Sequence, residues 1–336
     1  MSDHSRDEEG PDASIDLRAI RGALVAVLIL AIPYALHRVI VLEEHTPDLV
    51  HPWLGAATIG VLDLLLAASF LACFPVVLTK SPYRDRSPAL LGALGFAVVT
   101  VVWSILSPSP EGLVRSIQTL GTVGIVVAVS ELDTTGFRRL VVWPLTVTVL
   151  SQGSLAVAQT FIWGNGDTNG ITARWDHIWT QGYGTMQGGY ALAGLMILSM
   201  AIIASHARSR KLHPLMWLAI GIASVSAAAG FGRLGVLAVL GVGGFLAFGG
   251  LVARSRTQLA LAATSVIPMG IAIAVTWDAW SVRAQEAREL NQSGRESLVD
   301  QALTVIREFP FFGVGPGAYA RRATELIGSD VATVVH

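Results

Sequence analysis

The sequence predicts an all-α protein, a polytopic transmembrane helix bundle with a long outer loop that carries an amphipathic helix. Hydrophobic residues make up 52% of its 336 residues, charged residues 14%, and the mean hydropathy is +0.58. Charged residues are about a quarter of an ordinary soluble domain. Apolar stretches of nearly membrane-crossing length, roughly 20 residues, follow one another along the chain. The Lys and Arg residues between them alternate from rich loops to poor loops, as in multi-span membrane proteins.

The apolar stretches divide the chain into a tail, a span region and a final loop. Residues 1–16 are polar and acidic, and we expect a disordered cytoplasmic tail. Residues 17–277 are predicted to form a nine-span transmembrane region, and residues 278–336 an extracytoplasmic loop. The predicted spans are 22–42, 54–78, 89–106, 113–130, 140–161, 188–205, 214–230, 234–252 and 259–277. The first lacks a clear small-residue cleavage site, which favours a retained span over a signal peptide.

The basic residues predict the orientation, because Lys and Arg are enriched on the cytoplasmic side of membrane proteins. With the N-terminus inside, the inner side receives Arg18, Arg21, Lys80, Arg84, Arg86, Arg138, Arg139, Arg208, Arg210, Lys211, Arg254 and Arg256. The outer side receives Arg38, Arg115, Arg174 and Arg233. Twelve basic residues against four, alternating at each loop, favour nine spans with the final loop outside.

The final loop has helical signals of its own. Ser293 and Glu296 have the spacing of a capping box, in which each side chain satisfies a backbone N–H at the start of a helix. Apolar residues then recur at helical spacing at Leu298, Ala302, Val305 and Phe309. We therefore predict an amphipathic helix that lies across the outer face of the membrane.

A glycine-rich turn is predicted after this helix. Pro310 disfavours helical geometry in the preceding residue, so the helix should end near Glu308. Gly313, Gly315 and Gly317 then permit a tight turn that brings the backbone close to another surface. The G-V-G-P-G run lacks the Gly-Lys-Ser/Thr ending of a P-loop and the context of a dinucleotide site.

Two outer arginines are candidate binding residues. Arg233 lies in the tight turn between two apolar spans, and Arg174 lies in a loop rich in Gly, Trp and Asn. A guanidinium group binds phosphate through two parallel hydrogen bonds, which suits a lipid-linked pyrophosphate. The alternative is that each arginine extends to lipid headgroups or pairs with a nearby carboxylate such as Asp176. The sequence leaves both interpretations open.

The remaining polar residues give weaker signals. Asp63 lies inside the second predicted span, where it is either a functional acid or the partner of a polar neighbour. The single cysteine, Cys73, allows no disulfide framework and no cysteine zinc site. No pair of histidines has the spacing of metal ligands. We expect no metal, no cofactor and no nucleic-acid partner.

The final loop resembles the O-antigen ligase/polymerase superfamily. Residues 295–319 read R-E-S-L-V-D-Q-A-L-T-V-I-R-E-F-P-F-F-G-V-G-P-G-A-Y, and the chain later reads V-V-H at His336. Members of that family carry a helix, a P-x-x-G-x-G turn and then a His in a large outer loop. Nothing follows His336 here, whereas the family usually continues with Asn and further spans. We therefore expect this loop to be truncated at its end.

The resemblance implies a bacterial cytoplasmic (inner) membrane glycosyltransferase. It implies transfer of an undecaprenyl-pyrophosphate-linked glycan to a glycan or lipid acceptor hydroxyl, in cell-surface polysaccharide biosynthesis. His336 would be the general base on the acceptor, while Arg233 and Arg174 would bind the departing pyrophosphate. Arg295, Gly313 and Gly315 would support the site. The partners implied are these two substrates and membrane lipids.

Two other interpretations remain open. A transporter or flippase of lipid-linked substrates should show paired broken helices and more charge near the middle of the membrane. The sequence has one acid within a span and a long outer loop, which favours the enzyme. The end of the chain at His336 is also consistent with a truncated, inactive remnant.

Overall fold

The computed structural model describes residues 17–34, 38–43, 57–79, 88–162, 189–206, 212–230, 233–281, 299–311, 313–315 and 326. Nearly all of its regular structure is helical, as predicted. Its long helices are α1 (Leu17–Ala31), α2 (Val61–Thr79), α3 (Pro88–Leu106), α4 (Pro110–Ser130), α6 (Trp143–Phe161), α7 (Gly189–His206), α8 (Pro214–Ala229), α9 (Arg233–Val252) and α10 (Arg256–Val275). The short elements are η1 (Ile32–Tyr34), β1 (Arg38–Glu43), β2 (Ala57–Gly60), α5 (Thr134–Phe137) and a π-helix, η2 (Arg138–Val142).

The predictions for the first two spans, 22–42 and 54–78, are wrong at the C-terminal end of the first span and at the N-terminal end of the second. α1 ends at Ala31, and η1 follows it, because Pro33 has no N–H to continue the helical ladder. The β-branched run from Val39 to Val41 then forms strand β1, which pairs antiparallel with β2. Helix α2 accordingly begins at Val61 rather than at residue 54. High hydropathy does not distinguish a helix from a strand, which is why the predicted spans include these two strands.

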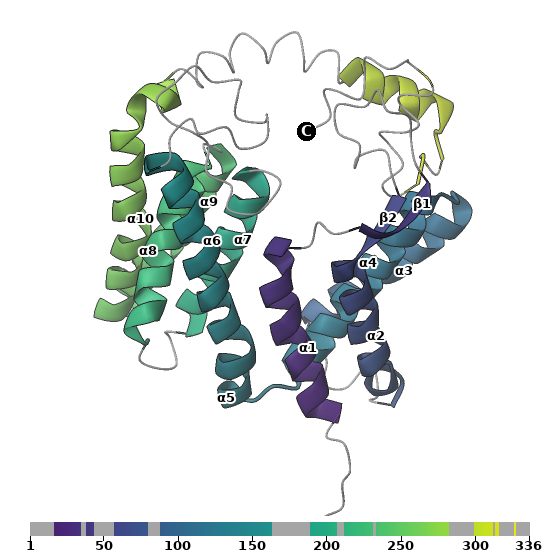
Figure 1. Ribbon diagram of the computed structural model, residues 1–336, viewed down its shortest axis with the longest axis horizontal. Helices are drawn as coiled ribbons and strands as arrows, with labels where there is room; N and C mark the ends of the chain where they lie inside the picture. Colours follow the sequence, from purple (N-terminus) through teal and green to yellow (C-terminus); the bar gives the residue numbers. More distant parts are fainter. Residues whose placement is uncertain are drawn as a thin grey trace, which may run out of the picture.

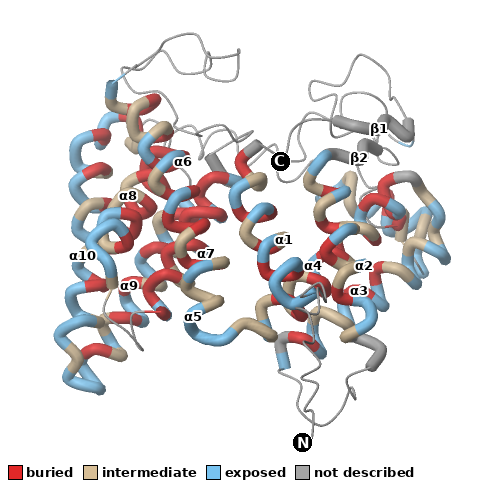
Figure 2. Tube along the Cα trace, turned by 60° about the horizontal axis from the view of Figure 1, so that its bottom comes forward, coloured by how far each residue is buried: buried red, intermediate tan, exposed pale blue. Residues whose placement is uncertain are grey.

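The long helices form two groups (Figure 1). In the first, α2 and α3 both pack on α4, and the β1–β2 sheet lies at one end of the group. In the second, α8 contacts α6, α7, α9 and α10, so it is the central helix. Helix α1 packs on α2, α4 and α6 and therefore connects the two groups. Each group has its own hydrophobic core, and Figure 2 shows buried residues on the inner sides of the helices.

Small residues allow the closest helix contacts. A Cβ added at Gly121 of α4 would lie 2.4 Å from Cβ of Leu66 in α2. A Cβ added at Gly124 would lie 2.7 Å from the backbone nitrogen of Phe70. The two glycines therefore let the backbones of α2 and α4 approach each other, as small residues do between membrane helices.

An ion pair joins α1 to the end of α4. Arg21 NH2 lies 2.6 Å from Oε2 of Glu131, and Arg21 Nε donates to the same oxygen at 2.8 Å. Each of the two side chains is only 9% exposed. Arg18 donates to the backbone carbonyl of Glu131. Two cations thus lie at the carboxyl end of α4, where the helix dipole is negative.

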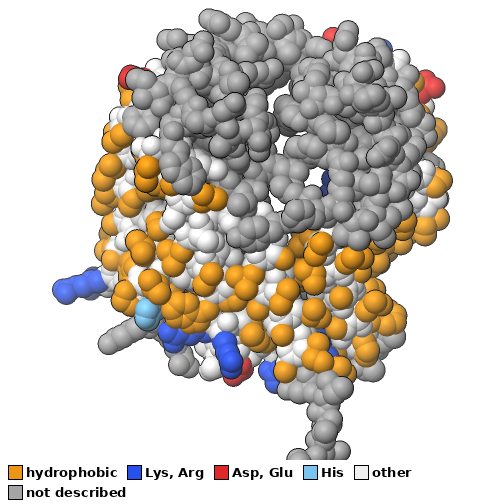
Figure 3. Space-filling view, viewed as in Figure 1, with side chains coloured by type: hydrophobic (Ala, Val, Ile, Leu, Met, Phe, Trp, Pro, Cys, Tyr) orange, Lys and Arg blue, Asp and Glu red, His pale blue; other side chains and the backbone are white. Residues whose placement is uncertain are grey.

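Four helices in the described part of the chain are long and apolar enough to cross a membrane. They are Glu111–Ser130, Thr134–Phe161, Arg233–Val252 and Arg256–Val275. Four shorter apolar helices accompany them: Val61–Val76, Leu90–Leu106, Ala191–His206 and Pro214–Ala229. Figure 3 shows hydrophobic side chains over the sides of the molecule and Lys and Arg side chains at its lower edge.

Candidate functional site

The glycine turn lies against the end of α3. Residues 299–308 are helical and the helix ends at Glu308, as Pro310 predicted. Gly313 and Gly315 both have left-handed backbone geometry, with φ values of 61° and 88°. The Ser107 hydroxyl donates to the carbonyl of Gly313 at 3.3 Å, and a Cβ added at Gly315 would lie 2.8 Å from the Ser107 carbonyl oxygen. The predicted close approach of this turn to another surface is confirmed at both glycines.

The helix before the turn has one buried face and one exposed face. Val305 is 4% exposed and packs against Phe309 and Val314, so the helix and the turn share a small core. The exposed apolar residues are Val299, Leu303, Ile306 and Phe311. Of the predicted apolar positions, Val305 and Phe309 belong to this core, while Val299, Leu303 and Ile306 form a second apolar stripe that is exposed and has helical spacing.

A chain of three polar side chains lies between α2 and α4. Gln118 Nε2 donates to Oδ1 of Asp63 at 2.8 Å, and Arg115 NH1 donates to Oε1 of Gln118, also at 2.8 Å. Arg115 and Gln118 are three residues apart on α4, which places them on the same face of the helix. Asp63 is buried, in the first turn of α2. The carboxylate thus orients the amide, and the amide orients the guanidinium.

Hydroxyl groups connect the neighbouring ends of α3 and α4. Ser109 caps α4 by accepting a hydrogen bond from the Gly112 N–H at 3.0 Å. Ser104 of α3 donates to the carbonyl of Gly112 at 3.0 Å, and Ser116 donates to the Ser104 hydroxyl at 3.0 Å. These bonds fix the α3–α4 turn on which the glycine turn rests.

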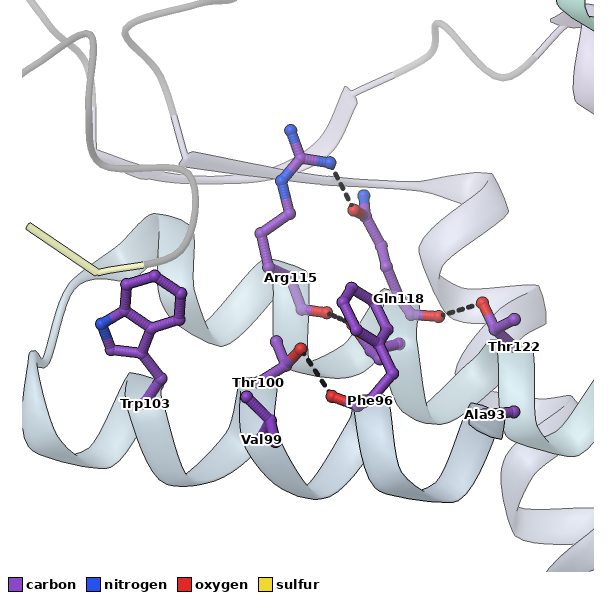
Figure 4. A pocket seen from close by; sticks show the side chains of 9 residues that line it. Ala93, Phe96, Val99, Thr100, Trp103, Arg115, Gln118 and Thr122 are labelled. Atoms are coloured by element: carbon purple, nitrogen blue, oxygen red, sulfur yellow. Dashed lines mark hydrogen bonds between the residues drawn. The ribbon is translucent and has the colours of Figure 1, made fainter. Parts of the chain in front are cut away.

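A cavity of about 420 Å³ opens beside this polar chain. Arg115, Gln118 and Trp103 rise from α3 and α4 on its open side, and the glycine turn passes near Trp103 (Figure 4). A Cβ added at Gly313 would lie 3.4 Å from the Trp103 ring. The cavity is lined by Ala93, Phe96, Val99, Thr100, Trp103, Arg115, Gln118, Thr119 and Thr122.

The arrangement suits recognition of an anion attached to an apolar group. Its charged group is one oriented guanidinium, and Ala93, Phe96, Val99 and Trp103 give it an apolar wall. In the part of the chain that the structure describes, no three His, Cys, Asp or Glu residues come together as metal ligands do. The described residues of this cavity include no paired acid and base for proton transfer.

The predicted site residues are described only in part. Arg233 is the first residue of α9 and is exposed, and the close packing of Gly235 on Ala193 and Ala227 fixes the start of that helix. Consecutive helices alternate in direction, so α9 begins at the end of the molecule that carries the β1–β2 sheet (Figure 1). Arg174, Arg295 and His336 lie outside the described residues, and their roles stay predictions.

The structure adds Arg115 and Gln118 to the candidate site. Arg115 was among the four outer basic residues, which was its signal in the sequence. Asp63 was an isolated acid in a predicted span, and the structure gives it a polar neighbour. Gln118 gave no signal, since a lone amide three residues after an arginine is common on any helix.

Comparison of the chain with protein-family models, with curated proteins and with solved structures gives no match. The class of protein is therefore defined by the features of this fold and this site alone. This is a helical protein with helices of membrane-crossing length and a glycine turn packed beside a cavity that Arg115 lines.

Proposed function

We propose that the chain is an integral membrane glycosyltransferase of the O-antigen ligase/polymerase kind. It transfers a glycan from undecaprenyl pyrophosphate to an acceptor hydroxyl in cell-surface polysaccharide biosynthesis. In this proposal it spans the bacterial cytoplasmic membrane with its N-terminus inside and its final loop outside. The supporting observation is the glycine turn, whose two left-handed glycines rest on the end of α3.

The charge distribution supports the same orientation. Arg233 begins α9 at the end of the molecule that carries the β1–β2 sheet, and Arg18 and Arg21 lie at the start of α1. Lys and Arg side chains gather at the opposite edge (Figure 3). A cytoplasmic membrane protein keeps most of its basic residues on the inner side. The end of the molecule with the β1–β2 sheet would then face outward. Arg233 would lie on that side, where it could bind the pyrophosphate of the donor.

The proposed reaction needs a base and a binding site for the leaving group. The acceptor oxygen forms a bond to the anomeric carbon of the glycan, and the bond from that carbon to the pyrophosphate oxygen breaks. His336 takes the acceptor proton, a role for which the neutral imidazole of a histidine is suited at neutral pH. Arg233 and Arg174 stabilise the negative charge that develops on the departing pyrophosphate. Arg295, Gly313 and Gly315 shape the loop around them.

Deletion of the gene in its own host tests the proposal. We expect deletion to cause accumulation of undecaprenyl-pyrophosphate-linked glycan and loss of surface polymer. Wild-type protein and the control Arg256→Ala should restore the polymer, whereas Arg233→Ala and His336→Ala should not. Normal polymer in both of the last two strains, at equal protein levels, would reject the catalytic assignment.

A transporter or flippase is the second candidate, and one observation favours it. Asp63, Gln118 and Arg115 form a polar chain at the side of an apolar helix pair, and intramembrane charges often mark a transport path. A flippase moves the lipid-linked glycan without breaking its pyrophosphate bond. Detection of free undecaprenyl pyrophosphate therefore separates the two candidates.

A further inference from the structure

We propose that the cavity beside Arg115, together with the groove that adjoins it, binds one anionic phospholipid of the surrounding bilayer. The phosphate would lie on Arg115 and an acyl chain along α3. This inference rests on the membrane placement proposed above, but it does not need the transfer reaction. It assigns a lipid site to α3 and α4, far along the chain from the residues proposed for catalysis.

The polar end of the site is Arg115. Among the side chains that the structure describes, its hydrogen-bond partner is Gln118, which takes one of the five guanidinium N–H groups. Figure 4 shows the guanidinium pointing away from α3 and α4. Asp63 holds Gln118 in place, so the guanidinium is oriented before a ligand arrives. The remaining donors suit two phosphate oxygens.

The apolar end of the site follows from α3. Val99 and Trp103 line the Arg115 cavity and also an adjoining groove of about 490 Å³. The other residues of this groove are Val98, Val102, Leu106 and Phe311. Helix α3 packs mainly on α4, which leaves Phe96 67% and Val99 59% exposed. An arginine side chain that adjoins an exposed apolar groove matches the phosphate headgroup and the acyl chain of a phospholipid.

The charge of the site favours an anionic phospholipid over other lipids. One guanidinium balances one phosphate diester, which carries a single negative charge. A lipid pyrophosphate would place its second phosphate without a cation among the described cavity residues. A choline headgroup would bring a fixed positive charge toward Arg115, which is repulsive.

The lipid would also contact the glycine turn. Phe311 is 90% exposed and lines the groove from the turn, while the rest of the groove belongs to α3. A chain in the groove would cover both surfaces and bury apolar area on each. The bound phospholipid would therefore hold the turn on α3 in addition to the Ser107 hydrogen bond.

Native mass spectrometry of the delipidated full chain tests the proposal. We expect phosphatidylglycerol to bind with one saturable site, and Arg115→Gln to weaken that binding about tenfold, the loss of one charge-assisted contact. Arg256→Gln, which removes the same charge from an exposed arginine at the start of α10, should bind as wild type. Val99→Trp keeps Arg115 but fills the groove, and it should also weaken binding.

Competing lipids complete the test. Phosphatidylcholine should bind at least tenfold more weakly than phosphatidylglycerol. Equal binding of phosphatidylglycerol to the wild type and to both cavity variants would overturn the proposal, as would equal binding of phosphatidylcholine. Stronger binding of undecaprenyl phosphate or pyrophosphate through Arg115 would overturn it too and identify a donor-lipid site. Saturable phosphatidylglycerol binding that Arg115→Gln weakens, in a protein without transfer activity, would reject the proposed function and leave this inference standing.

Discussion

At the scale of single residues, Gly315 and Ser107 determine how the final loop meets the helices. Gly315 has a φ of 88°, and a side chain there would point at the Ser107 carbonyl. A residue with a Cβ is strained in this backbone conformation even where there is space. Both effects act on the same contact, so the turn depends on glycine at this position.

Gly315→Ala should release the turn from α3. The strain and the 2.8 Å contact should favour the open state by about 1–3 kcal/mol. Hydrogen–deuterium exchange should then speed up at Phe309 and Gly313, whose N–H groups bond to the carbonyls of Val305 and Phe309. Gly244→Ala, in α9 with nothing within 4 Å of the added Cβ, is the control. Unchanged exchange in Gly315→Ala would show that the turn is not held there.

The Arg21–Glu131 ion pair should stabilise the contact between α1 and the end of α4. Both side chains are only 9% exposed, and removing one partner leaves the other charge buried, which costs about 3 kcal/mol. Arg21→Gln should therefore lower the thermal stability of the detergent-solubilised protein markedly, and Arg256→Gln should not. Adding Glu131→Gln to Arg21→Gln should restore part of the loss. An additive loss in the double variant would argue against the pair.

At the scale of elements, the sequence predicted most helices and missed the features that depend on distant contacts. Apolar length placed seven of the nine predicted spans within a few residues of the described helices, because hydropathy suffices there. The β1–β2 sheet was missed, since a strand becomes favourable through its pairing partner and not through its own hydropathy. The Asp63–Gln118–Arg115 chain was missed because its members come from two helices.

Packing between α2 and α4 should tolerate no side chain at Gly124. A Cβ there would lie within 2.8 Å of three heavy atoms of α2, and overpacking of this kind costs about 1–3 kcal/mol. Gly124→Ala should lower the thermal stability, although alanine favours a helix by itself. Gly95→Ala in α3 is the matched control, because nothing lies within 4 Å of its added Cβ. Equal stability of the two variants would contradict the close contact.

At the scale of the whole molecule, the proposed function requires the glycine turn and the start of α9 to lie on the outer side of a membrane. Four helices have the length and hydropathy to cross it, and four shorter apolar helices lie among them. The alternation of the long helices places the α3–α4 turn at one end of the molecule and the α9–α10 turn at the other (Figure 1).

Cysteine labelling tests this placement in whole cells. Pro108→Cys, exposed in the α3–α4 turn, should react with a membrane-impermeant maleimide in cells whose cytoplasmic membrane is intact. Ala253→Cys, exposed between α9 and α10, should react only after that membrane is permeabilised. The native Cys73 is fully buried, so the parent protein should give little background. The reverse pattern of labelling would show that the protein has the opposite orientation in the membrane.

The release of undecaprenyl pyrophosphate by the purified protein tests the central claim most directly. The wild-type chain, reconstituted with undecaprenyl-pyrophosphate-linked glycan and a matching acceptor, should release undecaprenyl pyrophosphate as the acceptor is extended. Arg233→Ala should reduce the rate by about 100-fold or more, the effect of removing one donor to a developing negative charge, and Arg256→Ala should not. Passage of the intact lipid-linked glycan across the membrane, with no acceptor-dependent release of undecaprenyl pyrophosphate, would contradict a transferase and identify a flippase.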